Sequence, residues 1–71
     1  MGSYEYRISD GIYLRKAEFS PPEVLGPGGW TTYGGEYGYR DWFTSSAATA
    51  EEVNLEEERL ARTGGGSGEV A

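Results

Sequence analysis

Residues 3–19 read SYEYRISDGIYLRKAEF, and this stretch decides the fold. Two runs rich in aromatic and β-branched residues flank the pair Asp10-Gly11. Asp and Gly tolerate the positive φ angles of a two-residue type I′ turn, whose twist matches that of the strands on either side. The stretch therefore predicts an antiparallel β-hairpin over residues 3–19.

A two-residue turn also fixes which residues face each other across the hairpin. Counting outward from the turn pairs Ser9 with Ile12, Ile8 with Tyr13, Arg7 with Leu14, Tyr6 with Arg15, Glu5 with Lys16 and Tyr4 with Ala17. One face then carries Tyr4, Tyr6, Ile8, Tyr13, Ala17 and Phe19, with Arg15 able to lie across Tyr6. The other face is mostly polar. This face has two apolar residues, Ile12 and Leu14. Either the hairpin is an ordinary two-stranded scaffold, or these two residues mark a second surface that faces a partner.

Residues 20–29 read SPPEVLGPGG and predict a loop or extended arm. Three prolines fix φ and remove backbone donors, and three glycines remove local preference. A polyproline ligand is the alternative, but the spacing is not PxxP. We expect Val24 and Leu25 to pack against the tyrosine face of the hairpin.

Residues 30–43 predict a second hairpin that turns at Gly34-Gly35. Trp30 would then face Tyr39, and Thr32 would face Tyr37, giving an aromatic cross-strand pair. Gly38 weakens the return strand, because it has no side chain to pack. The alternative is a segment rich in Gly and Tyr that has no fixed register.

Residues 46–62 predict an acidic helix. Thr49 and Glu52 have the spacing of a capping box, good helix formers follow, and Gly64 is a natural stop. Residues 64–71 have the composition of a flexible, disordered tail. The expected fold is therefore α+β in a single small domain over residues 1–63: a small antiparallel hairpin or meander followed by one acidic C-terminal helix.

The composition predicts that this domain is only marginally stable when it is isolated. Leu, Ile, Val and Phe together number eleven of the 71 residues, below the roughly 20% typical of ordered chains, and the net charge is −6. Six Tyr and two Trp compensate with aromatic surface, but the chain contains no Cys for a disulfide. We expect the chain to complete its burial against a partner.

Several functional classes are disfavoured by the residues that are missing. The chain has no His, no Cys and one Lys, so we expect neither an enzyme nor a bound cofactor or metal. Nucleic-acid binding is not expected, because binding a polyanion requires basic side chains. Residues 21–46 contain one basic residue, Arg40, and three acidic residues. Neither a membrane span nor a secretion signal is evident. The sequence predicts a location in the cytoplasm or in a virion assembled there.

Two sets of residues are candidates for binding a protein. The first is aromatic, since Tyr and Trp are common at protein interfaces: Trp30, Tyr33, Tyr37, Tyr39, Trp42 and Phe43. This set predicts a non-catalytic subunit of a larger assembly, such as a viral particle or a multiprotein complex. The second set is acidic: Glu51, Glu52, Glu56, Glu57 and Glu58. It predicts an inhibitor, of the kind phages use, that blocks a basic nucleic-acid-binding surface of a host protein.

Overall fold

The fold is α+β, with a five-stranded antiparallel sheet and two helices. A computed structural model describes residues 3–62. Along the chain the elements are β1 (Tyr4–Ser9), β2 (Ile12–Ala17), β3 (Glu23–Gly26), β4 (Gly29–Thr32), α1 (Gly35–Thr44), β5 (Ser46–Ala47) and α2 (Ala50–Leu60). The strand order in the sheet is β4-β3-β2-β1-β5. The expected helix stop at Gly64 and the tail over residues 64–71 lie outside the described residues.

The first hairpin is confirmed, together with its register. All six predicted pairs between β1 and β2 are present, from Ser9 opposite Ile12 to Tyr4 opposite Ala17. Asp10 and Gly11 have φ angles of 52° and 78°, as a type I′ turn requires. The Asp10-Gly11 turn and the alternation of side chains on either side therefore define the pairing of β1 with β2 in this sheet.

The expected arm over residues 20–29 is wrong in its middle, because Glu23–Gly26 forms strand β3 beside β2. The prolines do not prevent this, since Pro21, Pro22 and Pro27 all lie outside the strand. A side-chain pair ties β3 to β2, with Arg15 Nε 2.6 Å from Glu23 Oε1. Val24 pairs with Leu14 and so lies on the opposite face from the tyrosines, contrary to expectation.

The expected second hairpin over residues 30–43 is also wrong. β4 pairs backward with β3, so that Trp30 faces Leu25 instead of Tyr39. The pair Gly34-Gly35 leads into helix α1, and Gly35 has a φ of 73°. The physical reason is burial, because a helix places Gly38 and Trp42 on one side, where both are buried against the rest of the fold.

The C-terminal helix begins later than expected. Ser46–Ala47 forms the short edge strand β5, pairing with Arg7 and Ile8 of β1, and helix α2 starts at Ala50. The capping box is confirmed: the Thr49 side chain accepts from the Glu52 backbone N–H, and the Glu52 carboxylate accepts from the Thr49 N–H. Edge pairing therefore competes successfully with helix formation before the cap.

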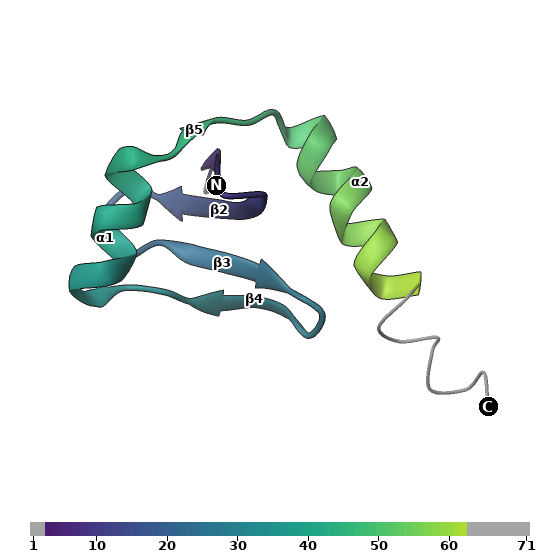
Figure 1. Ribbon diagram of the computed structural model, residues 1–71, viewed down its shortest axis with the longest axis horizontal. Coiled ribbons are helices and arrows are strands. Elements are labelled where there is room, and N and C mark those ends of the chain that lie inside the picture. Colours follow the sequence, from purple (N-terminus) through teal and green to yellow (C-terminus); the bar gives the residue numbers. More distant parts are fainter. Residues whose placement is uncertain (1–2, 63–71) are drawn as a thin grey trace.

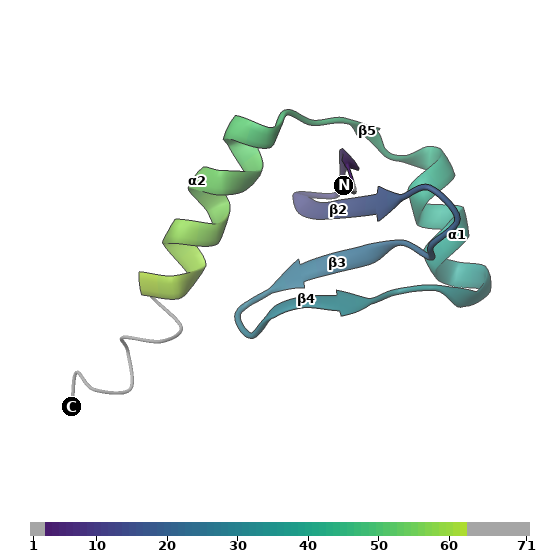
Figure 2. The same cartoon turned by 180° about the vertical axis from the view of Figure 1, so that it is seen from behind.

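The two helices lie at opposite ends of strands β2, β3 and β4 (Figures 1 and 2). Arg7, on the Leu14 face of the sheet, reaches α1: its guanidinium lies 5.5 Å from the Trp42 ring centroid. The opposite face carries Trp30, whose indole N–H donates to Glu57 of α2. The fully apolar core of the described residues is small, consisting of Leu14, Leu25, Trp42 and Val53.

Arg15 organises the aromatic side of the sheet. Its guanidinium carbon lies 4.1 Å from the Tyr4 ring centroid and 4.3 Å from that of Trp30. The same group pairs with Glu23, and the two side chains are only 20% and 29% exposed. A cation between two rings and a carboxylate replaces the aliphatic packing that this chain lacks.

We predict that Arg15→Ala lowers the free energy of unfolding by about 2 to 3 kcal/mol, because it removes two cation–π contacts and leaves Glu23 without its partner. Urea denaturation followed by tryptophan fluorescence measures this loss. Arg40→Ala is the matched control, since Arg40 covers the exposed ring of Tyr37 at 4.6 Å. Equal losses in the two variants would contradict the role given to Arg15.

Candidate functional site

The outward side of α1 presents an aromatic surface. We define the α1 outer face as Tyr37, Tyr39, Arg40 and Phe43. Phe43 is 74% exposed, Tyr37 64% and Tyr39 37%. Tyr39 and Phe43 stack at the spacing of one helical turn, with ring centroids 6.4 Å apart and an interplanar angle of 29°. Three aromatic rings thus meet solvent on one short helix.

The placement of this face follows from the helix period. Gly38 and Trp42 are four residues apart and buried, and three of the four residues that flank them in sequence, Tyr37, Tyr39 and Phe43, are exposed. Arg40 lies over the Tyr37 ring and keeps a cation on this surface. The arrangement resembles a binding surface in composition, with aromatic area beside an arginine.

The other aromatic candidates, Trp30, Tyr33 and Trp42, make contacts within the fold. Trp42 is 6% exposed, and Trp30 Nε1 donates to Glu57 Oε2 at 2.7 Å. Tyr33 donates its hydroxyl proton to Asp41 Oδ2 at 2.6 Å, and this bond raises the pKa of the Tyr33 phenol. The structure therefore divides the predicted aromatic set into Tyr37, Tyr39 and Phe43 at the surface and Trp30, Tyr33 and Trp42 in intramolecular contacts.

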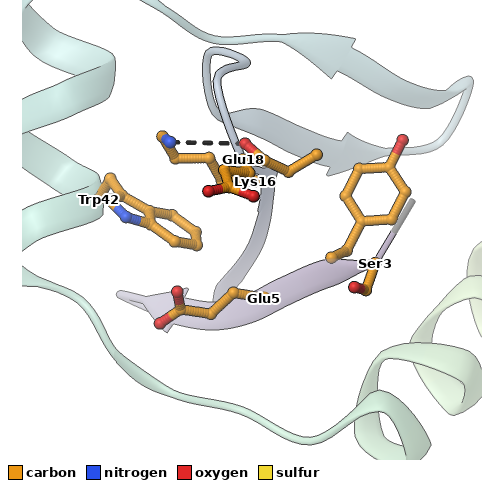
Figure 3. A pocket seen from close by; sticks show the side chains of 7 residues that line it. Ser3, Glu5, Lys16, Glu18 and Trp42 are labelled. Atoms are coloured by element: carbon orange, nitrogen blue, oxygen red, sulfur yellow. Dashed lines mark hydrogen bonds between the residues drawn. The ribbon is translucent and has the colours of Figure 1, made fainter. Parts of the chain in front are cut away.

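A pocket of about 410 Å³ opens beside Trp42 between α1 and the first hairpin. Figure 3 shows Trp42 projecting from α1 toward this pocket, with Glu5, Lys16 and Glu18 around it. Glu5 accepts from Arg7 at 3.1 Å, and Lys16 Nζ lies 3.5 Å from the Ala17 carbonyl oxygen. The pocket thus offers an aromatic wall and a rim with charges of both signs.

Arg7 joins this pocket to the end of α1. Its Nε donates to the Ser45 hydroxyl at 2.7 Å, and its Nη2 donates to the Ser45 carbonyl oxygen at 2.6 Å. Ser45 is the buried residue that caps α1. These bonds hold α1 against β1, and no local sequence pattern indicates them because the two residues are 38 positions apart.

The acidic candidates on α2 are divided in the same way. Glu52 completes the capping box, Glu57 accepts from Trp30, and Glu56 pairs with Arg59 at 2.6 Å. The Arg59 guanidinium lowers the pKa of Glu56. Glu51 and Glu58 are exposed. Three of the five carboxylates therefore have partners within the fold.

Two further properties bear on the kind of site. Across residues 3–62, the acidic side chains form no group of three or more that could hold a metal ion. Neither described helix has the length and apolar character needed to cross a membrane.

Comparison with family models, with curated proteins and with solved structures finds no match to this chain.

Proposed function

We propose that this chain is a non-catalytic protein-binding subunit that docks on a larger assembly through the α1 outer face. One observation carries the proposal: Tyr39 and Phe43 form a stacked pair in solvent, directly beside the buried Trp42. A small domain gains more stability from burying such rings than from exposing them. A partner surface that covers them supplies the burial that the four-residue core lacks.

The partner we propose is a protein with an apolar groove and an acidic rim. The apolar groove would receive Tyr39 and Phe43, and an acidic group at its edge would pair with Arg40, which remains accessible over Tyr37. The assembly would be a viral particle or a multiprotein complex of the cytoplasm. Trp30 and Trp42 would contribute indirectly, by fixing α1 and the sheet.

The test is site-specific photocrosslinking in the cells that make the protein. A photoreactive phenylalanine analogue at position 43 is expected to yield one discrete protein adduct, and the same analogue at Leu55 is expected to yield none. Leu55 is the matched control, because it is also an exposed apolar residue, 64% accessible, on the other helix. Equal adducts from both positions, or none from position 43, would contradict the proposal.

Salt and charge variants separate this function from the alternative, an acidic inhibitor of a basic surface. Binding through aromatic contacts should persist at about 0.5 M salt, whereas a charge-driven complex should weaken steeply. The double variant Glu51→Gln and Glu58→Gln removes exposed carboxylates and spares the Trp30, Thr49 and Arg59 partners of the other three. If this variant loses the partner and Phe43→Ser keeps it, the inhibitor function replaces the one proposed.

A further inference from the structure

Phe19 occupies an unfavourable position for an aromatic residue. Its side chain is 94% exposed, and its backbone has a φ of 65°, in the left-handed region. It is the third residue of a tight turn in which the Ser20 N–H donates to the Ala17 carbonyl oxygen at 3.1 Å. Such positions favour Gly or Asn, because a Cβ atom there costs about 1 to 2 kcal/mol.

Both features work against the isolated chain. The ring gains nothing from burial, and the backbone is strained by carrying it. The same turn could be made by Gly without either cost. Phe19 therefore has the properties of a projecting anchor, whose ring is available for insertion into an apolar pocket.

A suitable pocket lies at the far end of β3. It has a volume of about 340 Å³, and we call it the β3–β4 pocket; its walls include Leu25, Pro27, Trp30, Glu57, Leu60 and Ala61. A cavity of about 150 Å³ with apolar walls is enough to hold a benzene ring. The β3–β4 pocket therefore has room for a phenylalanine side chain, and its walls are mostly apolar.

The anchor and the pocket face different ends of the molecule. Phe19 lies in the connection before β3, at the end of the sheet near α1, and the pocket surrounds the turn after β3 (Figures 1 and 2). One copy cannot fill its own pocket across the length of the sheet. Because the two surfaces differ and lie at opposite ends, pairing them joins copies head to tail, and each added copy presents a further anchor or pocket unless the rotation between copies closes a ring.

We propose that Phe19 of one copy inserts into the β3–β4 pocket of a second copy, so that the protein self-associates into open-ended chains. This contact does not use the α1 outer face and is independent of the function proposed above. A second copy is the occupant that accounts for both features at once, the strained exposed ring and the apolar pocket, within one molecule.

The area buried predicts a weak contact. One phenyl side chain contributes about 200 Å² and the pocket walls a similar amount, well below the roughly 1,200 Å² of a stable interface. The charge of −6 on each copy adds repulsion, which salt screens. Association should therefore appear at high concentration, strengthen with salt and grow by one copy at a time.

Sedimentation velocity of the full chain tests the proposal. Between about 10 µM and 1 mM, with about 0.5 M NaCl to screen the repulsion, we expect the average mass to rise continuously above 7.7 kDa without a plateau at the dimer. Phe19→Gly removes the anchor, and Ala61→Glu places a charge at the pocket. Each variant alone is expected to remain monomeric. Their equimolar mixture is expected to form dimers and nothing larger, because it pairs one anchor with one pocket.

The controls separate this contact from the proposed function and from misfolding. Phe43→Ser removes an exposed ring from the α1 outer face and should self-associate like the unmodified chain. Phe19→Gly should unfold at the same or a higher temperature, since Gly relieves the strained φ. A single 7.7 kDa species at every concentration overturns the proposal. Association that survives Phe19→Gly, or long chains in the variant mixture, overturns it as well.

Discussion

Gly38→Ala is expected to destabilise the protein by about 3 kcal/mol or more, although Ala is ordinarily the better helix residue by about 1 kcal/mol. Gly38 is buried in the middle of α1. A methyl group on it would overlap the carbonyl oxygen and carbon of Tyr33, which are backbone atoms and cannot rotate aside. Tyr33 is itself fixed, because its N–H donates to the Pro22 carbonyl oxygen at 2.7 Å. Helix α1 and the turn that leads into it would have to shift apart.

Thermal and urea unfolding followed by circular dichroism measure this effect. Gly28→Ala is the matched control: a methyl group at position 28 meets no atom within 4 Å. That variant is expected to be neutral or to gain up to about 1 kcal/mol, by restricting the unfolded chain. If Gly38→Ala proves as stable as Gly28→Ala, α1 does not approach Tyr33 as closely as described.

Trp42→Ala is expected to cost about 3 to 5 kcal/mol, close to the whole stability of a domain of this size. Trp42 is 6% exposed, and its ring lies under the Arg7 guanidinium. Its removal would leave a large gap in a core of four apolar residues. We expect the variant to lose its cooperative unfolding transition at 25 °C.

Phe43→Ala, the next residue along α1, should change stability by less than about 0.5 kcal/mol. The two variants remove neighbouring aromatic side chains of the same helix, so they share any effect on helix propensity. Parallel denaturation curves compare them directly. Similar losses in both, or a larger loss for Phe43→Ala, would mean that α1 faces the sheet with its other side.

The first hairpin could be predicted from the sequence because its signals are local. Asp10-Gly11 defines the turn, and the alternation of apolar and polar residues on either side defines the two faces. The position of the turn and the register could therefore both be predicted. The Thr49–Glu52 capping box could be predicted for the same reason, since its two partners lie three residues apart.

Helix α1 could not be predicted in this way. Its N-cap is Gly34, which makes no side-chain cap, and its ten residues include an interior glycine and alternating aromatics that suit a strand equally well. The deciding interactions are the contact of Trp42 with Arg7 of the distant strand β1 and the close approach of Gly38 to the Tyr33 backbone. β3 was missed for a related reason: Glu23 and Val24 find their partners only once β2 is in place.

The candidate site was predicted in composition but not in detail. The density of aromatic residues near positions 30–43 indicated a binding surface, yet period-two and period-3.6 arrangements expose different members of the set. The helix places Tyr39 and Phe43 together and removes Trp42 from the surface. Phe19 was assigned to the tyrosine face of the hairpin, and no local pattern indicated its positive φ.

Nuclear Overhauser spectroscopy of the isotope-labelled chain tests directly whether residues 35–44 form a helix that buries Trp42 and exposes Tyr39 and Phe43. We expect sequential amide–amide contacts from Gly35 to Thr44, and contacts between the Trp42 ring and the Arg7 side chain. Cross-strand contacts that pair Trp30 with Tyr39 and Thr32 with Tyr37 would contradict this expectation, because they belong to a hairpin that exposes a different set of aromatic residues.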